Sequence, residues 1–288
     1  MQHIALLGLG VMGSGMAANW LAKGFAVTVW NRTRAKAEPL AAKGARIAAT
    51  PREAAKDADI IVAMVADDAA SRSVWLGDDG ALAGARNGAV AIEMSTVSPD
   101  WLHEFAATAR QRGLEVLDSP VGGSKAAAAA GQLVLFVGGD AATLDRVRPA
   151  LEAISREINH LGGAGAGTTW KLINNMVVAI QIAASAEALA LGEKAGFDRA
   201  RIADLIAGSG LGSPLVKMKM PRMSGLDFDN PDFALRHMIK DLGYAKDLAL
   251  SLGVSPDLAA AAAAYYTRAE AEGHGEQDFA AVLAPLRG

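Results

Sequence analysis

Cysteine is absent from this 288-residue chain, which excludes disulfides, thiolate metal sites and thiol nucleophiles. The five histidines show no HxxxH or HxH spacing that would place two metal ligands on one element: His3, His103, His160, His237 and His274. We therefore expect no metal site.

Long runs of like charge are also absent. The formal net charge is −3, and no block of Lys and Arg interleaves with aromatic residues, so we expect no nucleic-acid partner. The opening MQHIALLG has neither a basic segment nor a small-residue cleavage site, which favours a cytoplasmic protein. The uncharged run from Leu172 to Ala186 is shorter than the roughly 18 to 20 apolar residues of a membrane span, so we expect a buried helix and no membrane partner.

The chain has 51% apolar and 20% charged residues, and its length suits two domains of about 150 residues each. Its first half alternates short apolar runs with Ala-rich amphipathic segments, a pattern typical of βαβ units and a mostly parallel sheet. The predicted strands are HIALLG, FAVTVWN, DIIVAMVAD, AVAIEMS, LEVLDSP, QLVLFVGG and REINHLGG. Thr50-Pro51-Arg52-Glu53 is a predicted capping box, and Ser98-Pro99 opens another predicted helix.

Beyond about residue 164 the strand patterns stop and helical periodicity takes over. The predicted helices are 168–194, 199–207, 233–252, 256–272 and 279–286. The glycine-rich segment 162–167 is the predicted boundary, because glycine permits a sharp backbone turn. We expect an α/β domain over 1–164 and an all-α domain over 165–288 that begins with an interdomain helix, 165–194.

A G-x-G-x-x-G fingerprint lies between the first predicted strand and a helix, formed by Gly8, Gly10 and Gly13. In that context the backbone and the helix N-terminus can approach a dinucleotide pyrophosphate. The predicted cofactor-binding turn also includes Leu9, Val11 and Met12. The alternative is a glycine-rich turn with no ligand.

The next strand ends at Asn31-Arg32-Thr33, where an NAD-specific site usually carries an acid. An arginine with no acidic neighbour suits a ribose 2′-phosphate. We therefore predict a preference for NADPH and NADP, with NAD possible. Alternatively, Thr33 caps the following helix and Arg32 points into water.

Segments that follow the other strands should converge on one crevice. They contain Val65 and Ala66 after one strand and Thr96 after another, and we predict that all three contact the cofactor. Alternatively, and equally well, Thr96 only caps the helix that starts at Pro99.

The segment DSPVGGSK, 118–125, places two glycines after a proline. Successive N–H groups in such a turn form a nest for an anion, here a substrate carboxylate bound by Gly122, Gly123 and Ser124. An ordinary connecting loop needs the same residues.

Lys171 stands before the uncharged run, four residues from Asn175 on the same helix face. A lysine in a desolvated cleft exchanges a proton near neutral pH and can act as general acid to a carbonyl oxygen. Asn175 would hold the substrate or the lysine. The alternatives are a solvated surface charge and a helix-surface amide.

Four ordered stretches resemble the β-hydroxyacid dehydrogenases, the group that includes 3-hydroxyisobutyrate dehydrogenase, tartronate semialdehyde reductase and glyoxylate/succinic semialdehyde reductase. They are GLGVMGSGMAANW, DSPVGGSKAAAAAGQL, GAGTTWKLINN and FALRHMIKDLGYAKD, and they span nearly the whole chain. The GSK and GQL segments make the glyoxylate/succinic semialdehyde reductases the nearest in resemblance.

The resemblance implies a Rossmann-type domain followed by an all-α domain, as in 6-phosphogluconate dehydrogenase. It implies that Lys171 is the catalytic lysine, that Asn175 binds substrate, that Thr96 contacts the cofactor and that Lys240 lies beside the nicotinamide. It also implies a homodimer or homotetramer acting on a small aldehyde or semialdehyde, of the glyoxylate, succinic semialdehyde or methylmalonate semialdehyde type, and its hydroxyacid.

The chain departs from the family pattern at Gly122, where a serine hydroxyl usually stands. Loss of one such hydrogen bond changes affinity by roughly 0.5–1.5 kcal/mol. Two other functions fit the architecture: an imine reductase, which generally has another residue in place of Lys171, and a non-catalytic dinucleotide-binding protein.

Overall fold

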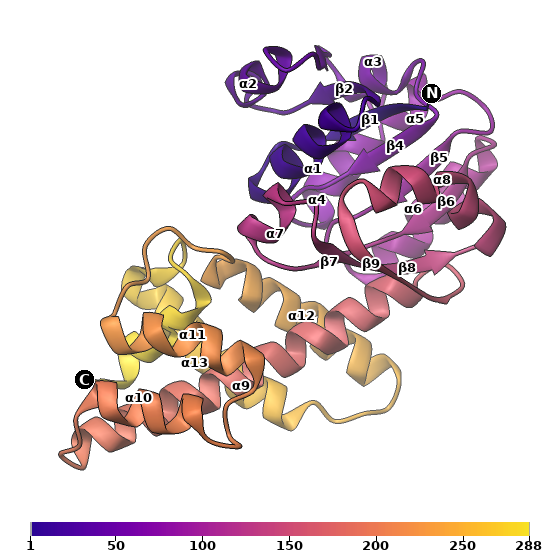
Figure 1. Ribbon diagram of the computed structural model, residues 1–288. Coiled ribbons are helices and arrows are strands. Elements are labelled where there is room, and N and C mark those ends of the chain that lie inside the picture. The colour runs from indigo at the N-terminus through magenta and orange to yellow at the C-terminus, as the bar shows by residue number, and fades with distance from the viewer. Residues whose placement is uncertain (1, 288) are drawn as a thin grey trace. The chain divides into compact units, whose positions relative to one another are not determined.

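The structure is a computed structural model that describes residues 2–287, and the chain divides into two compact units, Met1–Lys171 and Leu172–Gly288 (Figure 1). Unit 1 contains a sheet with helices, and the described part of unit 2 is helical apart from one isolated bridge, between Ala234 and Asp278. The predicted fold class, an α/β domain followed by an all-α domain, is confirmed.

Unit 1 is built on a nine-stranded sheet in the order β3-β2-β1-β4-β5-β6-β8-β7, with β9 paired to β8. The pairs of β8 with β6 and with β7 are antiparallel and the other pairs are parallel, so the prediction of a mostly parallel sheet is confirmed. The strands are β1 (His3–Leu7), β2 (Ala26–Trp30), β3 (Arg46–Ile47), β4 (Ile60–Ala63), β5 (Val90–Glu93), β6 (Glu115–Asp118), β7 (Val121–Gly122), β8 (Leu133–Gly139) and β9 (Ser155–Gly162).

Both faces of the sheet are covered. Along β1, Ile4 and Leu6 belong to one buried cluster, whereas Ala5 and Leu7 belong to another. Successive side chains of a strand point to opposite faces, so each cluster lies on its own side of the sheet. Burial on both faces explains why these strands read as continuous apolar runs.

Most helices of unit 1 connect consecutive strands, and side chains cap several of them. The Thr50 hydroxyl accepts from the Glu53 N–H (3.1 Å), which confirms the predicted cap. The helices are α1 (Val11–Ala22), η1 (Arg34–Lys36), α2 (Glu38–Ala41), α3 (Pro51–Ala55), α4 (Asp68–Trp75), α5 (Ala81–Gly84), α6 (Pro99–Gln111), α7 (Lys125–Ala129) and α8 (Ala141–Glu152).

Unit 2 packs its helices around a single apolar core. The inner face of α9 contributes Ile182 and Leu189, and Tyr266 is fully buried with its hydroxyl donating to the Ala179 carbonyl (3.1 Å). The helices are α9 (Ala166–Lys194), α10 (Arg199–Gly208), α11 (Pro214–Gly225), α12 (Leu235–Ser251), α13 (Asp257–Ala269), η2 (Glu270–His274) and η3 (Phe279–Leu286), with α9 beginning in unit 1.

Helix α9 has 29 residues and is long and apolar enough, by length and composition, to cross a membrane. The core helix of a soluble protein meets the same criteria. Leu172, Ile182 and Leu189 are fully buried, so one face of α9 belongs to the core. Ile173, Val177 and Leu191 are exposed, so the predicted buried helix is buried on one face only.

Helix α11 and the short strands β3 and β7 were not predicted, and one predicted helix is of a different type. Helix α11 contains Pro221, and strands β3 and β7 have only two residues each. The segment predicted as a helix over 279–286 is a 3₁₀-helix that contains Pro285. A proline lacks the N–H that continues an α-helix, and two residues show no periodicity.

Candidate active site

The glycine-rich turn between β1 and α1 needs each of its three glycines for a different reason. Gly8 has a φ of +108°, and a Cβ there would lie 2.3 Å from the Met64 carbonyl oxygen. A Cβ on Gly13 would lie 2.1 Å from the Gly8 carbonyl oxygen, so glycine allows the helix to pack against the turn. At Gly10, no described atom beyond Gly10 and its two chain neighbours lies within 4 Å of such a Cβ, so this side of the turn is open.

Gly10 is the N-cap of α1 and brings no side chain to the first N–H groups of the helix, which begins at Val11. Such N–H groups, with the positive end of the helix dipole, bind phosphate. The turn therefore fits the pyrophosphate of a dinucleotide.

The end of β2 is tied to this turn by Asn31. Its Oδ1 accepts from the Leu9 N–H (2.9 Å), and its Nδ2 donates to the Thr33 carbonyl (2.9 Å). Arg32 and Thr33 are exposed, and the Thr33 side chain makes no capping hydrogen bond to η1. The Arg32 guanidinium is therefore accessible to a phosphate beside the turn.

A side chain also joins the segments that follow β4 and β5. The Val65 N–H donates to the Ser95 hydroxyl (2.8 Å). Thr96 is partly buried and does not cap α6, because the hydroxyl that accepts from the Trp101 N–H belongs to Ser98 (3.2 Å). The suggestion that Thr96 caps this helix is wrong, and its proposed contact with the cofactor stays a prediction.

A buried acid organises this strand end. Glu93, the last residue of β5, is fully buried and accepts from the Ser71 hydroxyl (2.5 Å), the Trp75 indole (2.9 Å) and the Ser95 N–H (2.8 Å). The Trp101 indole donates to Ser71 in turn (2.8 Å). Burial raises the pKa of Glu93, and these hydrogen bonds offset the rise in part.

Asp118, the last residue of β6, is a second buried acid. Its two oxygens accept from the N–H groups of Gly165 and Thr168, each at 2.7 Å. Burial raises the pKa of Asp118, and the two N–H groups lower it in part. The carboxylate therefore caps the first turn of α9, the helix that carries Lys171.

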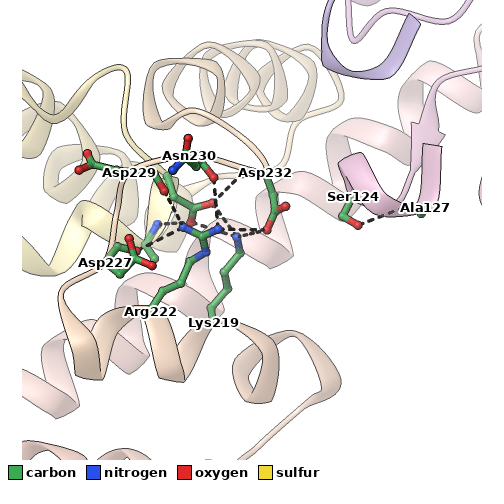
Figure 2. Close-up of polar contacts among 10 residues, drawn as sticks. Ser124, Ala127, Lys219, Arg222, Asp227, Asp229, Asn230 and Asp232 are labelled. Atoms are coloured by element: carbon green, nitrogen blue, oxygen red, sulfur yellow. Dashed lines mark hydrogen bonds and ion pairs between the residues drawn. The ribbon is translucent and has the colours of Figure 1, made fainter. Parts of the chain in front are cut away.

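The predicted anion-binding segment follows Asp118. Gly122 lies in β7 and pairs with Val134 of β8, so this part is a short strand rather than a free turn. Gly123 has a φ of +126°, and the Ser124 hydroxyl accepts from the Ala127 N–H at the start of α7 (3.3 Å, Figure 2). Since that bond uses only an oxygen lone pair, the Ser124 hydroxyl hydrogen can still donate to a ligand.

A side chain at position 122 would meet an aromatic ring. A Cβ on Gly122 would lie 3.2 Å from Cε2 of Phe136, whose ring centroid is 6.2 Å from that of Trp170. A serine at position 122 would require the Phe136 ring to shift. The absence of a side chain at Gly122 therefore goes together with the present position of that ring.

Lys171 is partly buried and ends unit 1, and Asn175 follows one turn later on the same helix. Asn175 is only 5% exposed, so the suggestion of a helix-surface amide is wrong. Its Nδ2 donates to Asp241 (2.6 Å), whose other oxygen lies 2.8 Å from Nζ of Lys240. Unit 2 thus brings together two of the predicted site residues, Asn175 and Lys240, through Asp241.

Lys240 is held on two sides within α12. Its Nζ lies 4.8 Å from the ring centroid of Tyr244 in addition to the ion pair with Asp241. The Lys240 side chain is 18% exposed, so it does not lie on a fully solvated helix face.

A second ionic cluster in unit 2 lies around Lys219, which is 1% exposed (Figure 2). Its Nζ donates to both oxygens of Asp278 (3.0 and 2.7 Å) and lies 3.4 Å from Asp232. Nearby, the Arg222 guanidinium donates to the carbonyls of Asp227, Asp229 and Asn230. These contacts fasten the segment before α12 to α11 and η3.

Sequence reasoning did not find Glu93, Asp118 and Asp241. Each is an acid at the end of a strand or inside a helix. Glu93 bonds Ser95 next to Thr96, Asp118 bonds the first turn of the helix that carries Lys171, and Asp241 bonds Asn175. The only signal was a charged residue in an apolar stretch, such as Glu93 in AVAIEMS. Among residues 2–287, no three His, Asp or Glu side chains are grouped to hold a metal ion.

Two family models together match nearly the whole chain. Residues 3–162 match the NAD binding domain of 6-phosphogluconate dehydrogenase, and residues 165–286 match the family described as "NAD-binding of NADP-dependent 3-hydroxyisobutyrate dehydrogenase". The first model alone covers more than half of the chain.

Similar proteins of known activity match end to end. The NAD-dependent L-serine dehydrogenase of Pseudomonas aeruginosa is 35% identical, over 98% of this chain and 97% of that protein. Glyoxylate/succinic semialdehyde reductase 1 of Arabidopsis thaliana is 34% identical, over 99% of both chains. The structure of Mycobacterium tuberculosis 3-hydroxyisobutyrate dehydrogenase with L-serine is 37% identical over 100% of both chains, with a TM-score of 0.89. The chain therefore belongs to the 3-hydroxyisobutyrate dehydrogenase-like β-hydroxyacid dehydrogenase family, and it is an NAD(P)-dependent oxidoreductase acting on CH–OH and C=O groups.

Proposed function

We propose that this enzyme interconverts a small aldehyde or semialdehyde that bears a carboxylate and the corresponding hydroxyacid, with NADPH as the preferred cofactor and Lys171 as general acid and base. The observation that carries the proposal is the placement of Lys171 one turn before Asn175, whose amide is buried and fixed by Asp241. A cytoplasmic location and a homo-oligomeric state complete the proposal.

The dinucleotide would be held by the strand ends of unit 1. The open backbone at Gly10 and the uncapped start of α1 suit its pyrophosphate, and Arg32 suits a 2′-phosphate. Val65, Ala66 and Thr96 would line the same edge of the sheet. When bound, the nicotinamide supplies or accepts the hydride.

Lys171 would move the proton that accompanies reduction. In that direction its ammonium group donates to the carbonyl oxygen as the hydroxyl forms, and in the oxidation direction the neutral amine accepts the hydroxyl proton. Asn175 would orient the substrate with its second amide hydrogen, because the first is committed to Asp241. The assignment of Lys240 to the cofactor stays a prediction.

The carboxylate would bind along Gly122, Gly123 and Ser124. The positive φ of Gly123 shows a backbone conformation that favours glycine, and the Ser124 hydroxyl keeps a hydrogen to donate. Support for a carboxylate comes from the similar proteins, since L-serine, glyoxylate and succinic semialdehyde all carry one.

The test is a Lys171→Ala variant. Loss of a general acid removes a factor of about 10²–10⁴ in kcat, whereas NADPH binding, measured by fluorescence titration, should change less than about twofold. Lys194→Ala is the matched control, because Lys194 is exposed at the other end of the same helix and should retain wild-type activity. Wild-type turnover by Lys171→Ala would refute the role of Lys171.

The substrate class is tested with a panel of semialdehydes, hydroxyacids and cyclic imines, each with NADPH and NADH and followed at 340 nm. We expect turnover of carboxylate-bearing aldehydes and no turnover of imines. Reduction of imines in preference to aldehydes would support the imine reductase alternative and contradict the proposal.

A further inference from the structure

The start of α9 is capped by a residue that lies far away in the sequence. Helix N-termini leave several N–H groups without partners, and a residue just before the helix usually caps them. Here the residue before Ala166 is Gly165, which has no side chain. Both oxygens of Asp118, 47 and 50 residues earlier, accept from Gly165 and Thr168 instead, each at 2.7 Å.

Two glycines make room for this cap. A Cβ on Gly138 of β8 would lie 2.4 Å from one Asp118 oxygen, and a Cβ on Gly167 would lie 3.0 Å from the other and 2.1 Å from the Phe136 carbonyl oxygen. The first turn of α9 therefore packs directly against the backbone of β8. Asp118 is fully buried, so the cap is shielded from water.

The position of this cap determines where Lys171 points. Lys171 is three residues beyond Thr168, less than one helical turn at 3.6 residues per turn. Fixing the N–H groups at 165 and 168 fixes the rotation of the helix about its axis, and hence the face on which Lys171 and Asn175 lie. Asp118 is also four residues before Gly122, so one residue joins the proposed carboxylate-binding segment to the helix of the proposed acid.

We propose that Asp118 is a positioning residue for the reaction: its buried carboxylate sets the orientation of the first turn of α9 and thereby places Lys171 against the substrate carbonyl. This inference rests on the proposed role of Lys171.

The first experiment replaces Asp118 by Asn. The amide has nearly the same shape, but its NH₂ faces a backbone N–H, so one of the two hydrogen bonds is lost. We expect kcat to fall about 10- to 100-fold, the scale of a misplaced catalytic group, with the dissociation constant of NADPH unchanged within about twofold. Hydrogen exchange of peptides covering residues 163–170 should become faster.

The matched control is Asp140→Asn. Asp140 caps α8 in unit 1, where it accepts from the Thr143 N–H (3.0 Å), and α8 carries no proposed site residue. Because the asparagine oxygen can still accept from the Thr143 N–H, and asparagine caps helices about as well as aspartate, this same substitution should leave both kcat and the melting temperature nearly unchanged. Should Asp118→Asn fail to fold, Asp118→Ser, whose small hydroxyl leaves room for a water, is used with the same expectations.

A double-mutant cycle separates this inference from the proposed function. If Asp118 acts through Lys171, Asp118→Asn lowers the residual rate of Lys171→Ala less than about threefold; Lys171→Arg provides a second background if that rate is too low. Equal losses in all backgrounds, or an unchanged kcat in Asp118→Asn, would overturn the positioning role while leaving Lys171 as the acid. An active Lys171→Ala would refute the proposed function itself, whatever the exchange data show for the cap.

Discussion

Arg32 is the residue on which the cofactor preference depends. It is exposed directly after β2, beside a turn that Asn31 fastens to Leu9. A charge-assisted pair with a 2′-phosphate contributes about 1.5–3 kcal/mol, which corresponds to a factor of roughly 10 to 150 in affinity. NADH has no such phosphate, so its binding should be nearly indifferent to this side chain.

We therefore expect Arg32→Ala to weaken NADPH binding by about one to two orders of magnitude and NADH binding less than about twofold. Titration of both cofactors against the variant measures this. Arg34→Ala is the control, because Arg34 is exposed two residues further on in η1 and should leave both affinities unchanged. An equal loss of both cofactors in Arg32→Ala would contradict the 2′-phosphate argument.

Among the elements, β5 and α4 meet at one buried carboxylate, and Trp101 of α6 joins them through Ser71. Glu93 accepts from Ser71 and Trp75 of α4 and from the Ser95 N–H, and Ser95 in turn holds Val65. Because all the partners of Glu93 are donors, a glutamine would turn its own NH₂ toward one of them. We expect Glu93→Gln to lower the free energy of unfolding by about 1–3 kcal/mol.

The size of that loss should depend on pH. Burial raises the folded-state pKa of Glu93 above the value of about 4.3 for an unfolded chain, so between those values the folded protein holds a proton that the unfolded chain has lost. The stability of the wild type therefore falls relative to the variant as pH rises through this window. Denaturant titrations from pH 4 to 8 should show the largest difference at the acid end.

Glu104→Gln is the control, because the effect of this substitution on stability should change with pH in the opposite direction. The hydrogen bond from Arg72 lowers the pKa of Glu104. The contribution of Glu104 to folding stability is therefore present at pH values above the pKa of the unfolded chain, and it is lost as the pH falls through the lowered pKa. A Glu93→Gln difference that grew with pH would contradict the assigned cause.

The elements also show how far the sequence could predict the structure. The long strands and helices, the capping box at Thr50 and the division into a sheet-containing and a helical part were predictable, because each has its own periodicity or turn residues. The glycines of the first turn were predictable from their spacing. The roles of Glu93, Asp118 and Asp241 were not, because they depend on partners that lie from 2 to 66 residues away in the chain.

For the whole molecule, the most exposed large apolar side chains are concentrated in the helical unit. Among the described residues, the large apolar side chains with more than 60% of their area exposed all lie in unit 2: Leu191, Phe197, Leu211, Leu252 and Leu258. Contiguous exposed apolar surface is typical of interfaces, although scattered single residues are not.

We expect a homodimer or homotetramer. Light scattering after size exclusion should give a mass of two or four times 29.6 kDa, stable on dilution. Single substitutions to aspartate should reduce the measured mass in at least one variant. The positions are Leu191, Phe197, Leu211, Leu252 and Leu258. A monomer at all concentrations would contradict this prediction.

The buried pair of Lys219 and Asp278 has a consequence for the order in which a nascent chain folds. Its two members are 59 residues apart, and Phe279 to Leu283 complete the core around them. Asp232 offers Lys219 only one longer contact, at 3.4 Å, and a buried lysine without a close carboxylate is strongly unfavourable, so we expect Lys219 to stay hydrated until the segment that contains Asp278 has left the ribosome. The sheet of unit 1 draws all its strands from residues 3–162 and can form well before that. We therefore expect the sheet of unit 1 to be complete during synthesis before Asp278 can pair with Lys219 in unit 2.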